Sequence, residues 1–191
     1  MADPIPLTGE PLAIDLVNTF PNTADGPVDL LADIARLRAW LKLQADRLPE
    51  SEATSAALTG ADLAAVHAVR EHITAAVHTA RHGKRLPTSA LDGLNAALQA
   101  APAIQELVRH GASVTLASRR LGTPGTRLAA LFAEDAAALL TDPAARKVRV
   151  CEAEDCVMLF LQTHPHRRWC SASRCGNRAR VARYYQRRKA S

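Results

Sequence analysis

The four cysteines are the residues whose chemistry is most readily inferred from the sequence. They lie within the last 41 residues in the pattern C-x4-C-x13-C-x4-C, at Cys151, Cys156, Cys170 and Cys175. Two matched pairs joined by a spacer of hairpin length can bring four thiolates to one point. Zn²⁺ accepts four sulfur ligands in a tetrahedron and has no geometric preference of its own. The pattern therefore predicts a structural zinc site with these four cysteines as ligands.

Two disulfides, or a redox or iron–sulfur centre, are the alternatives for these cysteines. The first 20 residues contain three acidic residues and lack a basic segment followed by an apolar one. We therefore expect no secretion signal and a cytoplasmic, reducing location in which thiols stay free. His164 and His166 stand in the spacer as possible replacement ligands, but Pro165 and the four available sulfurs favour a solvent-facing loop tip.

Charge divides the chain into two parts. Residues 146–191 contain twelve Lys and Arg against three Asp and Glu, a net charge of +9, whereas residues 1–145 have a net charge of −4. A short, strongly basic segment is typical of a module that binds a polyanion, and the alternative is a tail that only solubilises the protein. We expect two domains, residues 1–145 and residues 146–191. No apolar run is long enough to span a membrane, so no membrane partner is expected.

Short strands at 148–150 and 157–161, then a helix from Ser171 to about residue 188, are predicted to position the cysteines. This layout is similar to treble-clef zinc modules, with the second cysteine pair near the start of the helix. So small a unit cannot bury a core of its own, and metal binding would supply its folding free energy. Phe160 and Trp169 are expected to form its small hydrophobic cluster.

The predicted C-terminal helix carries basic side chains and no acidic residue. Arg180, Arg183 and Arg187 are spaced to share one face and to follow one phosphate strand. Asn177 and Arg178 are residue types that pair with adenine and guanine edges, or they hold the zinc loop together by hydrogen bonds. The candidate DNA-binding residues are Arg174, Asn177, Arg178, Arg180, Arg183 and Arg187. The residues expected to face back onto the zinc module are Val181, Tyr184 and Tyr185.

Residues 1–145 have mainly helical periodicity. Apolar residues recur every three to four positions in four runs. The first two follow the candidate caps Asp29 and Thr59, and the other two begin at Thr88 and Thr126. Segments at 104–108 and 113–118 flank a His-Gly turn and predict a β-hairpin, although the first is equally compatible with a helix. The expected fold class is mainly α with a minor β-hairpin, a helical N-terminal domain plus a small zinc-binding module.

Polar side chains interrupt an apolar segment at 12–19. Asp15, Asn18 and Thr19 would be costly to bury without partners. They are expected either to cap backbone groups at a helix end or turn, or to line a pocket for a small-molecule effector. These three are the candidate ligand-binding residues.

No catalytic arrangement is evident in the sequence. His67, His72, His78 and His82 share one predicted helix, but neither a zincin-type glutamate nor a third ligand accompanies them. The sequence shows no nucleophile–base pair, phosphate-binding loop or paired carboxylates, and we do not expect an enzyme.

The run CGNR at 175–178, preceded by RWC at 168–170, LFL at 159–161 and the first cysteine pair, resembles the CGNR zinc finger. The run LVNT at 16–19 resembles the N-terminal signature of the ABATE domain, which commonly precedes this finger in bacterial proteins. Together the resemblance covers nearly the whole chain. It implies a stress-related transcription regulator whose finger holds zinc through the four cysteines and binds DNA, and whose larger domain senses a ligand. The hairpin tip at 162–166 is shorter than in relatives, so a nucleic-acid contact by the tip is not carried over.

We therefore expect a bacterial, zinc-containing regulator that binds double-stranded DNA through its C-terminal arginines. One small finger would bind weakly, so a homodimer held by the N-terminal domain is expected to supply specificity. The alternatives are an RNA-binding module and a small-molecule-binding protein in which the finger is only structural.

Overall fold

The computed structural model describes residues 8–23, 26–49, 52 and 58–189. The N-terminal part forms α1 (Leu12–Val17), β1 (Asn22–Thr23), β2 (Gly26–Pro27), α2 (Ile34–Leu43), η1 (Ala45–Arg47), α4 (Gly60–Ala80), α5 (Thr88–Ala100), β3 (Ile104–His110), β4 (Ser113–Arg119) and α6 (Pro124–Thr141). The C-terminal part forms η2 (Pro143–Lys147), β5 (Val148–Val150), β6 (Leu159–Leu161), η3 (Ala172–Gly176) and α7 (Asn177–Lys189).

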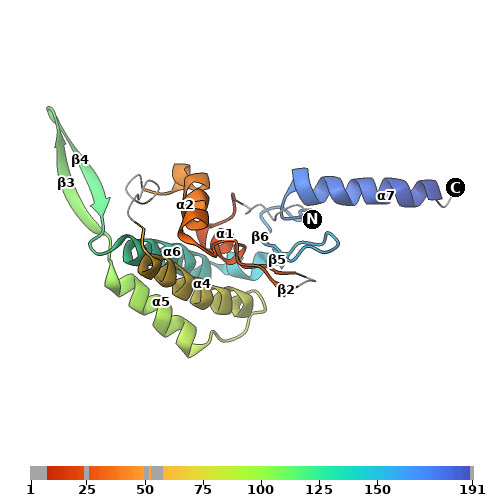
Figure 1. Ribbon diagram of the computed structural model, residues 1–191, viewed down its shortest axis with the longest axis horizontal. Coiled ribbons are helices and arrows are strands. Elements are labelled where there is room, and N and C mark those ends of the chain that lie inside the picture. The colour runs from red at the N-terminus through yellow and green to blue at the C-terminus, as the bar shows by residue number, and fades with distance from the viewer. Residues whose placement is uncertain (1–7, 24–25, 50–51, 53–57, 190–191) are drawn as a thin grey trace.

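The N-terminal body is built around α4 and α6, which pack along each other, while α5, α1 and α2 pack against this pair (Figure 1). Trp40 from α2 contacts Phe132 from α6, with the ring centroids 5.6 Å apart. One hydrophobic core results, and it also includes Val148 and Leu159 from the C-terminal part. The body therefore uses the first strands of the cysteine-containing segment to complete its own core.

Side-chain caps fix the starts of the long helices. The backbone N–H of Asp62 donates to Thr59 Oγ1, and the backbone N–H of Thr59 donates to Asp62 Oδ2 at 2.9 Å, so the expected cap of α4 is confirmed. The expected start of α6 at Thr126 is wrong. Thr123 caps this helix and Pro124 occupies its first turn, where its missing N–H costs no hydrogen bond.

Asp29 was expected to cap the helix now labelled α2, and this expectation is also wrong. The helix begins at Ile34 behind the cap Asp33. The carboxylate of Asp29 instead accepts both terminal nitrogens of Arg70 from α4, at 2.7 and 2.8 Å. A bidentate pair with a buried guanidinium holds the carboxylate more strongly than a backbone cap would.

The expected fold class, mainly α with minor β structure, is confirmed. The hairpin predicted at 104–118 forms as β3 and β4, which pair antiparallel over seven residues each, from Ile104↔Arg119 to His110↔Ser113. Gly111 lies in the turn with φ of 63°, a conformation that favours glycine. β5 forms as expected, whereas β6 covers only the last three residues of the strand predicted at 157–161.

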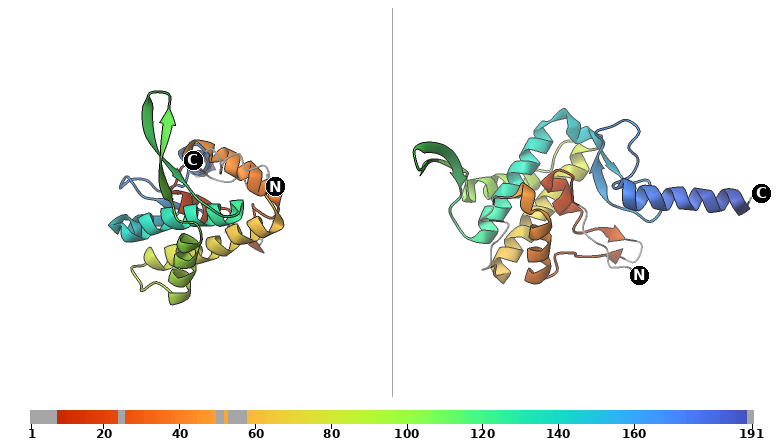
Figure 2. Two further views of the ribbon diagram at one scale, coloured as in Figure 1. Left: turned by 90° about the vertical axis from the view of Figure 1, so that its left-hand side faces the viewer. Right: turned by 90° about the horizontal axis from the view of Figure 1, so that it is seen from above.

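Two projections leave the body at opposite ends. Figure 1 shows α7 extending from one end and the β3–β4 hairpin extending from the other, and the right view of Figure 2 agrees. No helix in the described part of the chain is long and apolar enough to cross a membrane.

The closest approach of α4 and α6 generates a stability prediction. The backbone N–H of Gly125 donates to Asp62 Oδ1 at 2.7 Å, and a Cβ at Gly125 would lie 2.4 Å from the Cα of Asp62. Gly125→Ala should lower the free energy of unfolding by about 1–3 kcal/mol, because the added Cβ would clash with the backbone of Asp62, which cannot move aside. Urea unfolding of the full chain measures this. Gly60→Ala, where a Cβ meets nothing within 4 Å, is the control and should change stability little. Equal effects of the two variants would contradict the packing described.

Candidate metal centre and basic helix

The four cysteines come from three short segments around β5 and β6. Cys151 follows β5, and its backbone N–H donates to the Met158 carbonyl at 2.9 Å, which closes the turn that carries Cys156. Asp155 permits this turn by adopting a φ of 56°. Cys170 follows the loop after β6, and Cys175 lies in η3, a wide turn that continues into α7. The Ser171 side chain caps η3 by accepting the backbone N–H of Arg174 at 3.2 Å.

The four sulfur atoms converge on one point and all lie within 4.8 Å of one another. The sulfur–sulfur distance is 3.8 Å between Cys156 and Cys170, and 3.6 Å from Cys175 to each of these two. A tetrahedron with metal–sulfur bonds of about 2.3 Å has sulfur–sulfur edges of about 3.8 Å. All four cysteines are free thiols rather than disulfides. The cluster therefore fits a single tetrahedral metal ion.

The pKa values of the thiols also favour the binding of a cation. A hydrogen bond from Cys170 lowers the pKa of the Cys156 thiol to about 5, and the same contact raises the pKa of Cys170. Burial raises the pKa of Cys175 to about 11. Four adjacent thiolates repel one another, so full ionisation of the cluster needs a positive ion at its centre.

The groups around the sulfurs orient them. The backbone N–H of Cys170 donates to Cys151 Sγ at 3.3 Å. Arg178 lies 3.8 Å from Cys175 Sγ and donates to the carbonyl of Glu154 at 2.8 Å. Arg178 therefore ties the start of α7 to the first cysteine turn, which is the second of the two roles expected for it.

The small hydrophobic cluster expected from Phe160 and Trp169 is present beside the cysteines. Phe160 is buried, and the guanidinium of Arg167 stacks 4.7 Å from its ring centroid. His164 and His166 lie at the exposed loop tip with their rings 5.4 Å apart. In the described chain the metal-type cluster contains the four cysteines and neither histidine.

Two buried N-terminal residues attach β6 to the body. Asn18 donates from Nδ2 to the Leu159 carbonyl at 2.9 Å and accepts the Leu159 N–H at Oδ1 at 2.8 Å. One carboxylate oxygen of Glu10 accepts the Leu161 N–H at 2.8 Å, and the other pairs with Arg167. The metal centre is thus held against the body by side chains 141 or more residues away in sequence.

Asp15 and Thr19 also have internal partners. Asp15 is completely buried and accepts hydrogen bonds from Arg47 at 2.6 Å, Gln44 at 3.0 Å and the backbone of Gly9 at 2.9 Å. Burial raises the pKa of Asp15, and the bonds from Gln44 and Arg47 act in the opposite direction.

Thr19 donates to the Leu16 carbonyl at 2.6 Å and accepts from Arg70 at 3.1 Å. The polar atoms of Asp15, Asn18 and Thr19 thus face protein groups, which corresponds to the first of the two expected roles. A ligand-binding role for these residues stays a prediction that these contacts do not support.

No separate signal in the sequence pointed to Glu10 and Arg167. Glu10 precedes the apolar segment that drew attention to Asp15, and Arg167 belongs to the basic run before Cys170. Their pairing depends on how β6 docks on the body, which local patterns do not encode.

The candidate DNA-binding residues lie on or just before α7. Arg174, Asn177, Arg178, Arg180 and Arg187 are exposed, and the Arg180 guanidinium donates to Asn177 Oδ1 at 2.9 Å. The side chain of Arg183 lies outside the described part of the chain, although its backbone is in α7. The structure therefore brings Asn177 and Arg180 together, whereas Arg178 lies against the metal centre.

Val181, Tyr184 and Tyr185 were expected to face the zinc module, and this expectation is wrong. All three are more than half exposed, and the tyrosine rings pack edge to face at 5.7 Å. The reason is that α7 extends away from the module. Among the described elements, α7 contacts chiefly η3, from which it continues.

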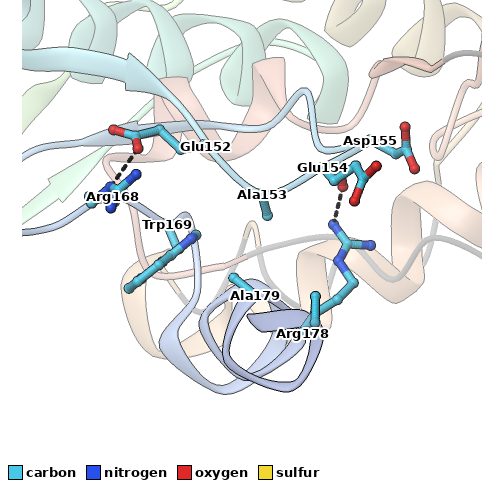
Figure 3. Close-up of a pocket in the computed structure, with 9 residues that line it drawn as sticks. Glu152, Ala153, Glu154, Asp155, Arg168, Trp169, Arg178 and Ala179 are labelled. Carbon is cyan, nitrogen blue, oxygen red and sulfur yellow. Dashed lines mark hydrogen bonds and ion pairs between the residues drawn. The ribbon is translucent and has the colours of Figure 1, made fainter. Parts of the chain in front are cut away.

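A cavity of about 280 Å³ lies between the first cysteine turn and α7 (Figure 3). Glu152, Glu154 and Asp155 line it together with Trp169. These are the only acidic residues of the basic segment, and they gather on one side of it. Arg168 and Arg178 line the same cavity, and Arg168 pairs with Glu152 at 2.5 Å, so the acidic charge there is largely balanced within the module.

The fold therefore consists of a helical body and a zinc-finger type of module, which contains the four-cysteine centre and the projecting basic helix. Residues 10–143 match the ABATE family model, described as "putative stress-induced transcription regulator", and residues 147–188 match the CGNR zinc finger model. The chain belongs to the ABATE family and carries the CGNR finger at its C-terminal side, as the resemblance implied. A comparison with curated proteins gave no match.

The Asn18–Leu159 contact generates a second stability prediction. Asn18→Asp replaces the donating amide with an acceptor that faces the buried Leu159 carbonyl. The free energy of unfolding should fall by about 1–3 kcal/mol at pH 8. Asn95→Asp makes the same change at an exposed site on α5 and should have little effect. Equal stability of the two variants in urea would show that the contact does not hold β6.

Proposed function

We propose that the protein is a cytoplasmic transcription regulator that binds double-stranded DNA through α7, with Zn²⁺ in the cysteine cluster. The observation that supports this most directly is the projection of α7 from the module with exposed basic side chains. A helix of 13 residues is about 20 Å long, and the major groove, about 12 Å wide, accepts one helix. Regulation of this kind needs no catalytic step, and we propose none.

The charge distribution supports one direction of approach. Arg178 faces the acidic cavity and is held there by its bond to Glu154, so DNA would contact the opposite side of α7, where Arg180 lies. Of the candidates, Arg180 and Arg187 are assigned to phosphates, and Arg174 lies at the end nearer the metal centre. Asn177 can turn to a base edge if the phosphate-bound Arg180 releases it.

Arg178 receives a different role in this proposal. Its bonds to Glu154 and to the sulfur of Cys175 make it a link between metal centre and helix. We propose that the ion, through this link, fixes the direction in which α7 leaves the module. Loss of the ion would then lower DNA affinity without removing any phosphate contact.

Zinc is proposed because a cluster of four thiolates with tetrahedral spacing suits Zn²⁺ and is closed to further ligands. Elemental analysis of purified protein should find close to one zinc per chain. Cys170→Ser should lose the metal and unfold residues near β6, because three sulfurs cannot complete the shell. Ser173→Ala, in the same turn but not a ligand, should retain it. Iron or no metal in the unchanged protein would contradict the assignment.

DNA binding is tested with a mixed-sequence duplex of 30 base pairs across a salt series. Arg180→Ala with Arg187→Ala should weaken binding and reduce the slope of log affinity against log salt by about 2, because about one counterion is released per phosphate contact. Arg85→Ala, an exposed arginine on the body, is the matched control and should leave the slope unchanged.

The exposed tyrosines favour one competing function. Tyr184 and Tyr185 could stack on unpaired bases, as aromatic residues do in proteins that bind single strands or RNA. The same titration with single-stranded and structured RNA of equal length separates these functions. Tighter binding to RNA than to the duplex, with a loss on Tyr185→Ala, would replace the DNA proposal.

A further inference from the structure

The β3–β4 hairpin is an arm that projects from the body beyond its base. Both views in Figure 2 show it extending away from the helices, and in the described chain its sheet contains only these two strands. Near the base, Gln105, Ser118 and Arg119 line a cavity together with Arg127 and Glu134 of α6. A two-stranded hairpin alone is at best marginally stable in water. An arm of seven residue pairs therefore needs a contact beyond this chain to justify its length.

One face of the arm carries three exposed apolar side chains, beside Arg109, Gln105 and Ser118. Leu107 is 77% exposed, Leu116 66% and Val114 58%. The register pairs Leu107 with Leu116 directly, and Val114 lies two residues further along β4, so all three share a face. Exposed leucines adjacent across a hairpin are typical of a contact surface rather than of a solvated one.

The free edge of β4 is unprotected. β4 reads SVTLASR, without proline and with one charge, Arg119, which lies at its end and pairs with Glu106 of β3 at 2.6 Å. Proteins normally block open edges with charges, prolines or bulges. Because His110 and Ser113 close the hairpin as a bonded pair, alternation turns the N–H and C=O of Val114, Leu116 and Ser118 to the open edge.

We propose that β4 pairs antiparallel with β4 of a second copy of this chain, with Leu116 opposite Leu116. The pairing then places Val114 opposite Ser118 and Thr115 opposite Ala117, so no like charges face each other. The four strands would form one sheet in the order β3, β4, β4, β3, with the leucines of both copies in a continuous apolar row.

A second copy is the favoured occupant because β4 is complementary to itself. When a strand pairs antiparallel with its own copy, residues at equal distances from the central residue lie opposite each other. With Leu116 at the centre, this pairing in β4 brings no like charges together. The contact is isologous, as in most homodimers. An edge of seven residues is about 24 Å long and buries little area, so the dimer should be weak and should form in the micromolar range.

Sedimentation equilibrium without DNA tests the proposal, so its outcome is independent of the proposed DNA binding. The unchanged protein should have the mass of two chains at high concentration and dissociate on dilution. Leu116→Lys should weaken dimerisation at least tenfold. Gln105→Lys adds the same charge to the same face but on β3, away from the edge, and should dimerise normally.

Leu116→Pro distinguishes edge pairing from face packing when it is compared with Leu116→Ala, because both variants lose the leucine side chain and Leu116→Pro alone also loses the N–H. Proline at this position removes an N–H that faces the open edge and leaves the β3–β4 bonds intact. The variant should be monomeric with unchanged circular dichroism. Hydrogen exchange at Val114, Leu116 and Ser118 should slow as protein concentration rises. A monomeric unchanged protein at several hundred micromolar, a dimer that survives Leu116→Pro, or fast exchange of these amides in the dimer would each overturn the proposal.

Discussion

The amide of Asn18 is the interaction on which the arrangement of the two parts depends. It matches both the N–H and the carbonyl of Leu159, as a neighbouring strand would, and it does so in the buried region between α1 and β6. A buried backbone pair left without partners is costly, so β6 has one docked position rather than many. Glu10 adds a second attachment through Leu161 and Arg167. Through these two attachments, the helical body holds the metal centre in place.

A chain of contacts leads from this attachment to the basic helix. β6 carries Phe160, whose buried ring is covered by Arg167, and the same arginine donates to the carbonyl of Cys170 at 2.8 Å. Cys170 and Cys175 share the sulfur cluster, and Arg178 joins Cys175 to the first residues of α7. In the proposed function, the direction of α7 depends on the cluster, and the contacts of β6 attach the cluster to the body. The acidic side chains of this segment lie beside the cysteine cluster, whereas many of its basic side chains lie on the helix that extends from it.

Local chemistry in the sequence predicted the elements better than their partners. The cysteine spacing identified the metal cluster, and the Thr59–Asp62 box identified the start of α4, because both depend on residues close in the chain. The Asn18–Leu159 contact spans 141 residues and leaves no local pattern. The apolar side of α7 was assigned to the module because periodicity shows which residues share a face but not whether anything covers that face. Asp29 was assigned to a cap for a similar reason, since its true partner Arg70 lies 41 residues away.

The Asn18 contact also bears on how such chains can diversify. Asn18 recognises the main chain of Leu159, not its side chain, so substitutions at that position of β6 change packing without removing the attachment. The constraint thus falls on one amide in α1 and on the extended shape of three residues in β6. Exchange of one finger for another by recombination would preserve the attachment wherever these two features persist. The boundary between the two family matches, at residues 143–147, therefore does not divide the folded molecule, because Val148 and Leu159 belong to the core of the body.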